Sequence, residues 1–324
     1  MKASVFCFSD SGAVLAGKLC QLLSLDQACI CRGIGVDMGK LFAENDALIF
    51  IGACGIAVRT IAPYIKSKIT DPAVIVIDDQ GRYVIPVLSG HIGGANKLAE
   101  QIASKLGAIP VITTATDGAG KFSCDAWAVQ NDCVISSLET AKKVSSSILK
   151  NDIPVISDFE LPSTLPNGLV AGKTGDIGIY IGIHEKSPFK STLRLIPRIL
   201  TLGIGCRRDT TREHLQSVIK TVFADNCLDI RAVGRIASID VKKGEKGLLS
   251  LAKELNAELL FYTADELNGA EGDFDESDFV RKTVGTGNVC ERSAAIDGGK
   301  LIVRKTMADG VTVAVAEKEW RIEF

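Results

Sequence analysis

Three segments of the chain decide its fold: ALIFIGACGIAVR (Ala47–Arg59), YVIPVLSGHIGGAN (Tyr83–Asn96) and IPVITTATD (Ile109–Asp117). Each begins with an apolar, β-branched run and ends in a glycine-rich or polar break. Continuous apolar runs are typical of strands that are covered on both faces of a parallel sheet. In an open α/β sheet, loops at the ends of adjacent strands meet in one crevice and bind ligands. We therefore expect the three breaks to form one site.

The sequence around these segments alternates between strand and helix patterns, which indicates the α/β class. The expected elements are strands at Ala3–Phe8 and Ala28–Cys31, a helix at Val14–Leu23, a hairpin of Ala73–Asp78 with Tyr83–Leu88, and a helix from Gly94 to Leu106 that Gly107 ends. Residues 1–130 are therefore predicted to form a doubly wound, mostly parallel sheet with one antiparallel insertion.

Two further domains are expected after residue 130. A capping box at Ser136–Glu139 opens a helix in a small α/β middle domain, residues 131–190. The polar, proline-containing segment Glu185–Pro197 is the predicted linker. A C-terminal α/β domain with a mixed sheet, residues 195–324, follows; Thr210 and Glu213 cap its first helix. It closes on an antiparallel pair, Lys300–Lys305 with Val311–Glu317.

Composition excludes several classes of protein. A net charge of −2 and a pI near 6.0 argue against nucleic-acid binding. The apolar run Ala3–Phe8 is too short for a signal peptide, and no run is long enough to span a bilayer, so a cytoplasmic protein is expected. The ten cysteines contain no C-x-x-C, and none of the three histidines has metal-ligand spacing with another. No protein-bound metal is expected.

Two segments resemble phosphate-binding loops but lack the required pattern. GLVAGKT (Gly168–Thr174) has too few residues between its glycines and precedes a strand-like run instead of a helix. GIGCRR (Gly203–Arg208) has an arginine where a dinucleotide fingerprint needs its third glycine. A nucleotide-dependent enzyme is therefore disfavoured.

The segment LSGHIGGAN (Leu88–Asn96) is the strongest candidate site. Its glycines, Gly90, Gly93 and Gly94, permit close backbone approach, and free amides before the helix would bind an anion. Asn96 can add an amide contact, and His91 is expected to be exposed and able to titrate. The alternative is that these glycines only make a tight turn.

Weaker candidates lie elsewhere in the chain. Arg59 could bind a carboxylate or be a solvated surface charge. The hydroxyls and carboxylate of Thr113–Asp117 could contact substrate or cap a turn. Polar breaks at the C-terminal strand ends, Cys206–Arg208, Lys242–Glu245 and Cys290–Ala294, are candidates by residue chemistry alone.

Seven segments together resemble the cobalamin biosynthesis protein G family, the cobalt-precorrin-5A hydrolases of anaerobic vitamin B12 synthesis. They are Gly52–Val74, Val84–Ala99, Pro110–Asp117, Leu202–Arg208, Ile236–Ala252, Val289–Ala294 and Gly310–Ala316. The resemblance covers nearly the whole chain, whereas Val134–Glu185 carries little of it and fits a variable domain.

The resemblance implies opening of the δ-lactone of cobalt-precorrin-5A, with loss of acetaldehyde, to give cobalt-precorrin-5B. The substrate is a large, flat, anionic macrocycle that brings its own cobalt, so no cofactor is expected. Arg59, Lys68, Arg207 and Arg208 would pair with its carboxylates. The alternative is a non-catalytic carrier of a tetrapyrrole in the same pathway. The partners compatible with the resemblance are a second copy of the chain or the neighbouring methyltransferases.

We expect His91 to act as general base, directly or through Asp117, on water that attacks the lactone. Backbone amides around Gly90–Gly94 would hold the oxyanion. The competing mechanism uses Ser89 or Cys54 as nucleophile. We expect the macrocycle to lie between the N- and C-terminal domains. The residues expected to contact it are Gly52, Gly55, Arg59, Lys68, Gly90, Gly93, Gly94, Asn96, Thr113, Thr114, Thr116, Gly203, Gly205, Cys206, Arg207, Arg208, Lys242, Glu245, Glu291, Arg292 and Ser293.

Overall fold

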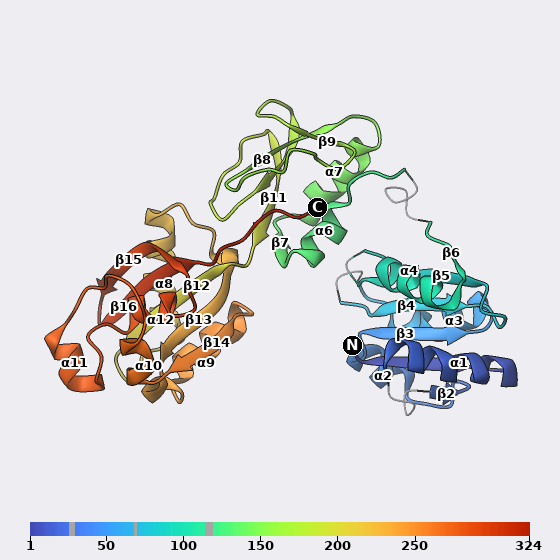
Figure 1. The fold of residues 1–324 in the computed structure, drawn as a ribbon, viewed down its shortest axis with the longest axis horizontal. Coiled ribbons are helices and arrows are strands. Elements are labelled where there is room, and N and C mark those ends of the chain that lie inside the picture. The colour runs from blue at the N-terminus through green and yellow to red at the C-terminus, as the bar shows by residue number, and fades with distance from the viewer. Residues whose placement is uncertain (26–29, 68–69, 92, 114–118) are drawn as a thin grey trace. The chain divides into compact units, whose positions relative to one another are not determined.

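The computed structural model describes residues 1–25, 30–67, 70–91, 93–113 and 119–324. The chain divides into two compact units, Met1–Val129 and Gln130–Phe324. The first unit contains one β-sheet and the second contains two (Figure 1). Within the described residues, no helix is both long enough and apolar enough to cross a membrane.

The sheet of the first unit has the strand order β2-β1-β3-β4-β5-β6. Its strands are β1 (Ala3–Cys7), β2 (Ile30–Arg32), β3 (Ala47–Ile51), β4 (Ala73–Ile77), β5 (Tyr83–Leu88) and β6 (Ile109–Pro110). Neighbouring strands are parallel except β4 and β5, which form an antiparallel hairpin. The predicted mostly parallel sheet with one antiparallel insertion is confirmed.

Helices cover both faces of this sheet, as a doubly wound fold requires. They are α1 (Asp10–Leu23), α2 (Met38–Glu44), α3 (Cys54–Ile61), the 3-10 turn η2 (Ala62–Tyr64) and α4 (Ala95–Leu106). Helix α6 (Cys124–Gln130) follows this sheet in the sequence. Leu19 of α1 and Ile102 of α4 pack with Ile49 on one face. Phe42 of α2 packs with Phe50 on the other. Alternate residues of β3 thus serve two cores, which explains its continuous apolar sequence.

The turn between β4 and β5 is closed by one carboxylate. Asp78 Oδ1 accepts hydrogen bonds from the backbone amides of Arg82 and Tyr83, each at 2.7 Å. Gly81 has a φ of 67°, which glycine adopts without a steric penalty. The turn fixes a register in which Val84 lies beside Ile77.

Three helices begin at a residue other than the one predicted. Helix α1 begins at Asp10 instead of Val14, because the Ser9 side chain accepts the Gly12 amide. The cap of the helix in the middle sheet is Ser137 instead of Ser136. The cap of the first C-terminal helix is Thr211 instead of Thr210. The last two differences are of one residue, because either of two adjacent hydroxyl residues could accept the helix amide.

The middle sheet, in the second unit, has the order β7-β11-β10-β8-β9. Its elements are β7 (Cys133–Ile135), α7 (Leu138–Ile148), β8 (Ile153–Ser157), β9 (Leu169–Ala171), β10 (Ile177–Ile181) and β11 (Ser191–Pro197). The prediction of a linker at Glu185–Pro197 is wrong for its second half. Strand β11 lies between β10 and β7, with Leu193 and Leu195 fully buried. The alternation of Leu193, Arg194 and Leu195 is a strand pattern that the flanking prolines obscured.

The C-terminal sheet is mixed, as predicted, with the order β14-β13-β12-β16-β15. Its strands are β12 (Leu200–Cys206), β13 (Val233–Ile239), β14 (Glu258–Tyr262), β15 (Lys300–Ala308) and β16 (Val311–Glu317). Its helices are α8 (Arg212–Asp225), η3 (Ile230–Ala232), η4 (Asp240–Lys242), α9 (Lys246–Glu254), α10 (Ala264–Asn268), α11 (Asp278–Val284) and α12 (Cys290–Ala295). Leu215 of α8 and Leu248 of α9 share one core, and Cys290 and Ala294 of α12 line another.

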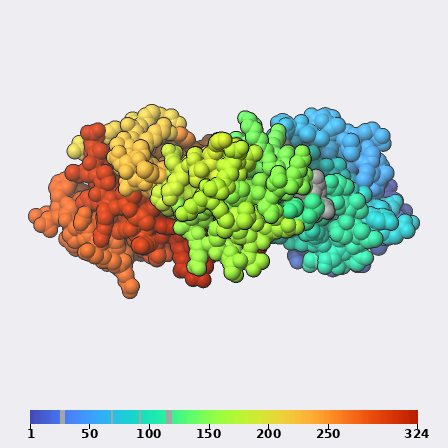
Figure 2. Space-filling view, turned by 90° about the horizontal axis from the view of Figure 1, so that it is seen from above, coloured from blue at the N-terminus to red at the C-terminus, as the bar shows by residue number. Residues whose placement is uncertain are grey.

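A buried carboxylate joins the middle and C-terminal sheets. Asp229 is 1% exposed and pairs with Arg231 at 2.7 Å and with Arg194 of β11 at 2.9 Å. Burial alone would raise the pKa of Asp229, but the hydrogen bonds from Arg231 and the charges of both arginines outweigh it and hold the pKa low. Trp320 also packs edge-on against Phe159, with ring centres 4.8 Å apart. In the space-filling view of Figure 2, the yellow-green residues of the middle sheet and the orange and red residues of the C-terminal sheet adjoin without a gap.

Candidate functional site

The glycine-rich loop between β5 and α4 is tightly closed on itself. Ser89 and Gly94 have left-handed backbones, with φ of 56° and 77°. Three amides donate to carbonyls of the same loop: Gly94 N to His91 O at 3.0 Å, Ala95 N to Ser89 O at 3.1 Å, and Asn96 N to Gly90 O at 2.9 Å. The prediction of free amides for an anion is wrong for these three, because their hydrogens are already used.

Two glycines of this loop have no room for a side chain. A Cβ on Gly93 would lie 2.3 Å from the Cβ of Ser89. A Cβ on Gly90 would lie 2.8 Å from Oδ1 of Asn96. Asn96 therefore covers Gly90. The loop shape that places His91 depends on glycine at both positions.

His91 lies half-buried beside a serine that the sequence did not single out. Its Nδ1 is 3.3 Å from Oγ of Ser123, the residue that precedes α6. Ser123 is also half-buried, and its Oγ accepts the amide of Ala126 at 3.4 Å. An imidazole and a hydroxyl at this separation can exchange a proton. The sequence feature that could have pointed to Ser123 is its position at the start of a helix whose Trp127 and Ala128 are buried.

Ser89 has a structural role instead of the predicted catalytic one. It is 8% exposed, and its Oγ donates to the carbonyl of Asp71 at 2.9 Å. The Asp71 carboxylate in turn accepts the amides of Lys66 and Ser67, at 2.9 and 3.0 Å. Ser89 therefore joins two loops, and its only proton is committed to a carbonyl. Its assignment as nucleophile is contradicted by this geometry.

A small hollow of about 180 Å³ lies at the same edge of the sheet as this loop. It is lined by Met1, Asp46, Ala47, Ala73, Gly93, Gly94, Lys97, Leu98 and Gln101. Lys97 is exposed, and none of the described carboxylates pairs with it. The glycine loop is therefore adjacent to a recess that has one available cation.

The loop after β5 lies at the opposite edge of the sheet from the loop after β3. Ile51, at the end of β3, lies beside Ile77, at the end of β4. Leu88, at the end of β5, instead lies beside Val74, near the start of β4. His91 therefore lies at the edge where β3 and β4 begin. The two edges are separated by about 13 Å, the rise of four strand residues.

The prediction that three breaks share one crevice is therefore wrong. Gly52, Gly55 and Arg59 follow β3 at the other edge, and the Arg59 guanidinium lies beside Gly55. Arg59 is exposed and forms no ion pair with the described carboxylates, so its charge is available. Thr113 follows β6, which runs parallel to β5, and so shares the edge of His91. Four predicted site residues lie outside the described ranges: Lys68, Thr114, Thr116 and Asp117.

In the C-terminal sheet, a largely buried ion pair lies in the loop after β13, and its carboxylate also bonds to the loop after β12. Lys242 Nζ lies 2.8 Å from Glu245 Oε1, and these side chains are 14% and 11% exposed. The Lys242 hydrogen bond lowers the pKa of Glu245. The amide of Asp209 donates to Glu245 Oε2 at 3.0 Å. Their predicted binding of substrate through free charges is not supported, because the two charges neutralise each other.

Arg207 and Arg208 remain available at this edge. Both are exposed, and neither forms an ion pair with a carboxylate in the described part of the chain. Arg207 packs over Gly310, where an added Cβ would lie 2.7 Å from its Nε. Burial raises the pKa of the neighbouring Cys206 thiol, which favours its neutral form. The edge therefore offers two free cations beside a neutral thiol.

The glycines of LGIGC serve packing. A Cβ on Gly203 would lie 1.9 Å from the carbonyl oxygen of Cys290, so α12 can approach β12 only over glycine. A Cβ on Gly205 would lie 2.5 Å from Thr312 Oγ1 on the paired strand. These close approaches account for both glycines without a ligand.

Gly203→Ala is expected to lower the free energy of unfolding of the second unit by about 1–3 kcal/mol, because α12 must move away from the sheet. Urea unfolding followed by circular dichroism measures this loss. Gly244→Ala is the matched control, since an added Cβ there meets nothing within 4 Å. Equal unfolding midpoints for the two variants would contradict the packing role.

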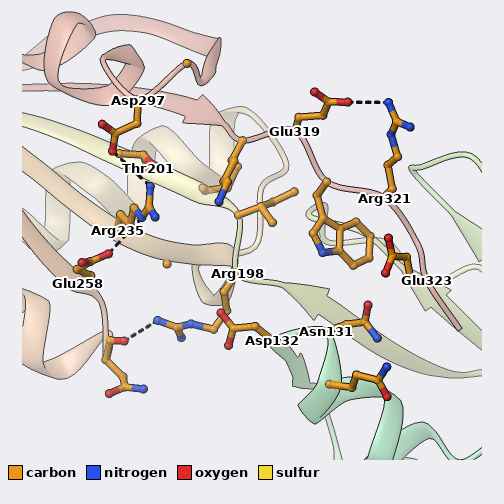
Figure 3. Close-up of a pocket in the computed structure, with 18 residues that line it drawn as sticks. Asn131, Asp132, Arg198, Thr201, Arg235, Glu258, Asp297, Glu319, Arg321 and Glu323 are labelled. Atoms are coloured by element: carbon orange, nitrogen blue, oxygen red, sulfur yellow. Dashed lines mark hydrogen bonds and ion pairs between the residues drawn. The ribbon is translucent and has the colours of Figure 1, made fainter.

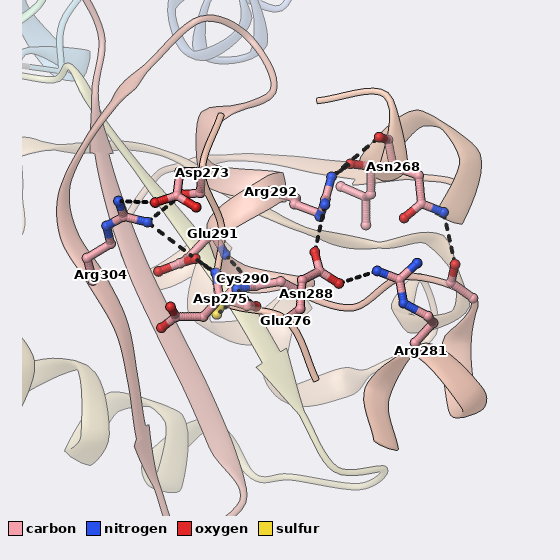
Figure 4. Close-up of polar contacts among 12 residues, drawn as sticks. Asn268, Asp273, Asp275, Glu276, Arg281, Asn288, Cys290, Glu291, Arg292 and Arg304 are labelled. Carbon is pink, nitrogen blue, oxygen red and sulfur yellow. Dashed lines mark hydrogen bonds and ion pairs between the residues drawn. The ribbon is translucent and has the colours of Figure 1, made fainter. Parts of the chain in front are cut away.

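Glu291 is fully buried, and backbone and amide groups hold it (Figure 4). Its Oε2 accepts the Asp275 amide and Asn288 Nδ2, and its Oε1 accepts the Lys305 amide, each at 2.9 Å. A carboxylate with three donors and no exposed surface cannot meet a substrate. The predicted contact of Glu291 with substrate is therefore wrong.

The other two predicted residues of α12 are structural as well. Ser293 is fully buried, and its Oγ lies 3.3 Å from the carbonyl oxygens of Ala237 and Cys290. Arg292 donates to Glu276 Oε1 at 2.7 Å (Figure 4). Its guanidinium also stacks over the ring of Phe274, 4.9 Å from the ring centre. Both side chains are committed to packing, which corrects their assignment to substrate binding.

A larger hollow of about 1070 Å³ lies in the second unit, where β12, β13 and β14 begin (Figure 3). Its charged side chains largely pair among themselves. Arg235 pairs with Glu258 at 3.2 Å and with Asp297 at 3.3 Å, and Arg321 pairs with Glu319 at 2.9 Å. Self-paired charges of both signs favour a solvated groove over a site for an anion.

Two segments match models of one protein family. Residues 37–117 match the model described as cobalamin synthesis G N-terminal, and residues 200–316 match the model described as cobalamin synthesis G C-terminus. Together they cover more than half of the chain. The chain belongs to the cobalamin synthesis G family.

Two relatives of similar sequence support the same membership, and one solved structure is also similar to the chain. A cobalt-precorrin-5A hydrolase from Salmonella typhimurium is 35% identical, over 96% of this chain and 96% of its own. One from Priestia megaterium is 33% identical, over 86% of this chain and 80% of its own. A crystal structure of a cobalamin biosynthesis protein G homologue from Sulfolobus solfataricus is 26% identical and covers 98% of this chain and 97% of its own, with a TM-score of 0.44.

In this cobalamin synthesis G protein, the N-terminal family match includes His91 and Arg59, whereas Ser123 lies beyond its end. The C-terminal match includes Arg207 and Arg208. Within the described residues, no group of three or more His, Cys, Asp or Glu side chains is arranged to hold a metal ion. Among the described residues, the groups suited to chemistry or binding include the His91 imidazole with its hydroxyl partner and several cations without an ion pair.

Proposed function

We propose that this protein is a cobalt-precorrin-5A hydrolase, which opens the δ-lactone of its substrate and releases acetaldehyde to give cobalt-precorrin-5B. The observation that carries the proposal is the 35% identity to a cobalt-precorrin-5A hydrolase over 96% of both chains. In this scheme cobalt belongs to the substrate, and the protein contributes no cofactor of its own.

The imidazole of His91 supplies the base that lactone opening needs. Histidine commonly takes this role near neutral pH. Opening the lactone frees the ring oxygen as an alkoxide. When this oxygen forms the C=O bond of acetaldehyde, the carbon–carbon bond between the two-carbon unit and the macrocycle breaks. The electron pair of that bond stays on the macrocycle and takes up a proton. Hydrolysis and acetaldehyde release then balance without an oxidant or reductant.

Unpaired arginines are suited to the carboxylate arms of the macrocycle. Arg59, Arg207 and Arg208 are exposed and form no ion pair with described carboxylates. Guanidinium groups bind carboxylates through two parallel hydrogen bonds. These side chains support an anionic substrate on a chain whose net charge is −2.

Arg59→Ala and Arg207→Ala are each expected to weaken substrate binding by about 1.5–3 kcal/mol, the contribution of a charge-assisted hydrogen bond. Fluorescence or absorbance titration with cobalt-precorrin-5A measures this as a tenfold or larger rise in Kd. Arg321→Ala is the control, because that guanidinium is 82% exposed and already pairs with Glu319. A Kd that neither site variant changes would remove these residues from the binding surface.

Incubation of the full chain with cobalt-precorrin-5A tests the function directly. A hydrolase releases one acetaldehyde per substrate consumed, and the mass of the macrocycle changes by the gain of one water and the loss of one acetaldehyde. A non-catalytic carrier changes the absorbance of the macrocycle on binding and releases no acetaldehyde. Binding without acetaldehyde, under conditions in which the Salmonella relative turns over, would reject the proposed activity.

A further inference from the structure

Ser123 and His91 form a hydroxyl–imidazole pair whose members come from separate elements of the first unit. The Oγ–Nδ1 distance is 3.3 Å, and both residues are half-buried. The two residues are 32 positions apart in the sequence, so the fold rather than local chain geometry brings them together. Nucleophile–base pairs are often looser than 3.2 Å before substrate binds.

We propose that Ser123 is the nucleophile of the lactone-opening reaction and that His91 is its base. This inference rests on the proposed function and specifies which hydroxyl attacks the lactone. The Ala126 amide donates to Ser123 Oγ at 3.4 Å, which occupies one lone pair and leaves the single hydroxyl proton for His91 Nδ1.

The two nucleophiles considered from the sequence are less suitable. Ser89 Oγ gives its proton to the Asp71 carbonyl, at 2.9 Å, and is nearly buried. Cys54 begins α3, at the other edge of the sheet from His91. In the described part of the chain, Ser123 places a half-buried hydroxyl 3.3 Å from the imidazole.

The reaction balances in two steps. Ser123 Oγ bonds to the lactone carbonyl carbon, His91 takes the hydroxyl proton, the ring C–O bond breaks, and the leaving alkoxide takes the proton. The intermediate is an ester of Ser123 with the carboxyl arm of the opened substrate. Water then attacks this ester, His91 transfers the water proton to Ser123 Oγ, and the free carboxylic acid leaves.

A purely structural serine would only cap α6. Ser123→Asn separates the two roles, because asparagine caps helices as well as serine but has no hydroxyl. We expect Ser123→Asn and Ser123→Ala to reduce acetaldehyde release by about a thousandfold or more. Ser137→Ala, which removes the cap of α7, is the matched control with unchanged turnover. Turnover by Ser123→Asn within about tenfold of the unmodified chain would overturn the proposal.

Combining substitutions tests whether the pair acts as one unit. Residues that form one nucleophile–base pair are not additive, so the double variant Ser123→Ala/His91→Ala should be no slower than the slower single variant. If water attacked the lactone directly, with His91 as its base, Ser123→Ala would have a small effect, and that effect would multiply with the effect of His91→Ala.

A fluorophosphonate probe tests the nucleophile without the substrate. Attack by Ser123 forms an O–P bond and expels fluoride, and His91 accepts the proton. We expect one label per chain, on the peptide that contains Ser123, in the unmodified chain and in Ser137→Ala. The label should disappear in Ser123→Ala and His91→Ala. Labelling of Ser89, or none in the folded chain, would overturn the assignment; absent acetaldehyde with labelled Ser123 would instead reject the proposed substrate.

Discussion

His91→Ala is expected to slow acetaldehyde release from cobalt-precorrin-5A by about 10²–10⁴-fold, the usual contribution of a general base. The fold of the first unit should persist. The loop around His91 is shaped by its internal hydrogen bonds and by Gly90 and Gly93, and none of these interactions uses the imidazole. Steady-state kinetics with an acetaldehyde-coupled dehydrogenase measures the loss.

His214→Ala is the matched control, because that ring contacts only the backbone oxygen of Asp309 among the contacts described, at 3.2 Å. Its turnover should match that of the unmodified chain. Partial recovery of His91→Ala by added imidazole would support a lost base over a distorted loop. Near-normal acetaldehyde release by His91→Ala would remove the residue from the chemistry.

Asp229→Ala should lower the free energy of unfolding of the second unit by about 3 kcal/mol, the low end of the cost of breaking a buried ion pair. The low end applies because the two arginines that lose their partner are themselves 19% and 34% exposed. Urea unfolding of a Trp127→Phe background measures the change, since Trp320 then reports on this unit alone. Asp176→Ala is the control, because its pair with Lys190 is fully in solvent and should leave the midpoint unchanged.

This loss should depend on pH in one direction. The pKa of Asp229 is lower in the folded chain than in the unfolded chain. Such a carboxylate stabilises the fold above the unfolded value, about 3.9 for aspartate, and the stabilisation is lost as the pH falls through the folded value. The gap between the unmodified chain and Asp229→Ala should be full at pH 7 and should shrink below about pH 4. A gap that is constant across this range would contradict the ion-pair origin.

The core strands were predictable because their residues carry a local signal. Both strands are continuous apolar runs: β3 has the predicted bounds Ala47–Ile51, and β4 ends at Ile77, one residue before the predicted Asp78. Gly107 ends α4 as predicted, in a left-handed conformation with φ of 70°. Such features depend on a few neighbouring residues, so a sequence window contains them.

The site was harder to predict because it depends on strand direction and on distant contacts. The β4–β5 hairpin was expected, but its consequence for the site was missed. Because β5 runs antiparallel to β4, His91 and Arg59 lie at opposite edges of the sheet. Glu291 has a carboxylate that could contact a ligand. The three groups that donate hydrogen bonds to this carboxylate are 3 to 16 residues away in the sequence, so a short window does not reveal that it is already satisfied. Ser123 shows no pattern that distinguishes it from a helix cap; only the fold brings it to His91.

The carboxylate that closes the β4–β5 turn has a consequence far from the turn itself. Through its bonds to the amides of Arg82 and Tyr83, Asp78 sets which residue of β5 lies beside which residue of β4. Losing one residue from this turn would slide β5 by one position and reverse the face on which each of its side chains lies. The number of residues between Asp78 and His91 is therefore constrained. Homologous chains should vary in the identity of the turn residues while keeping their number.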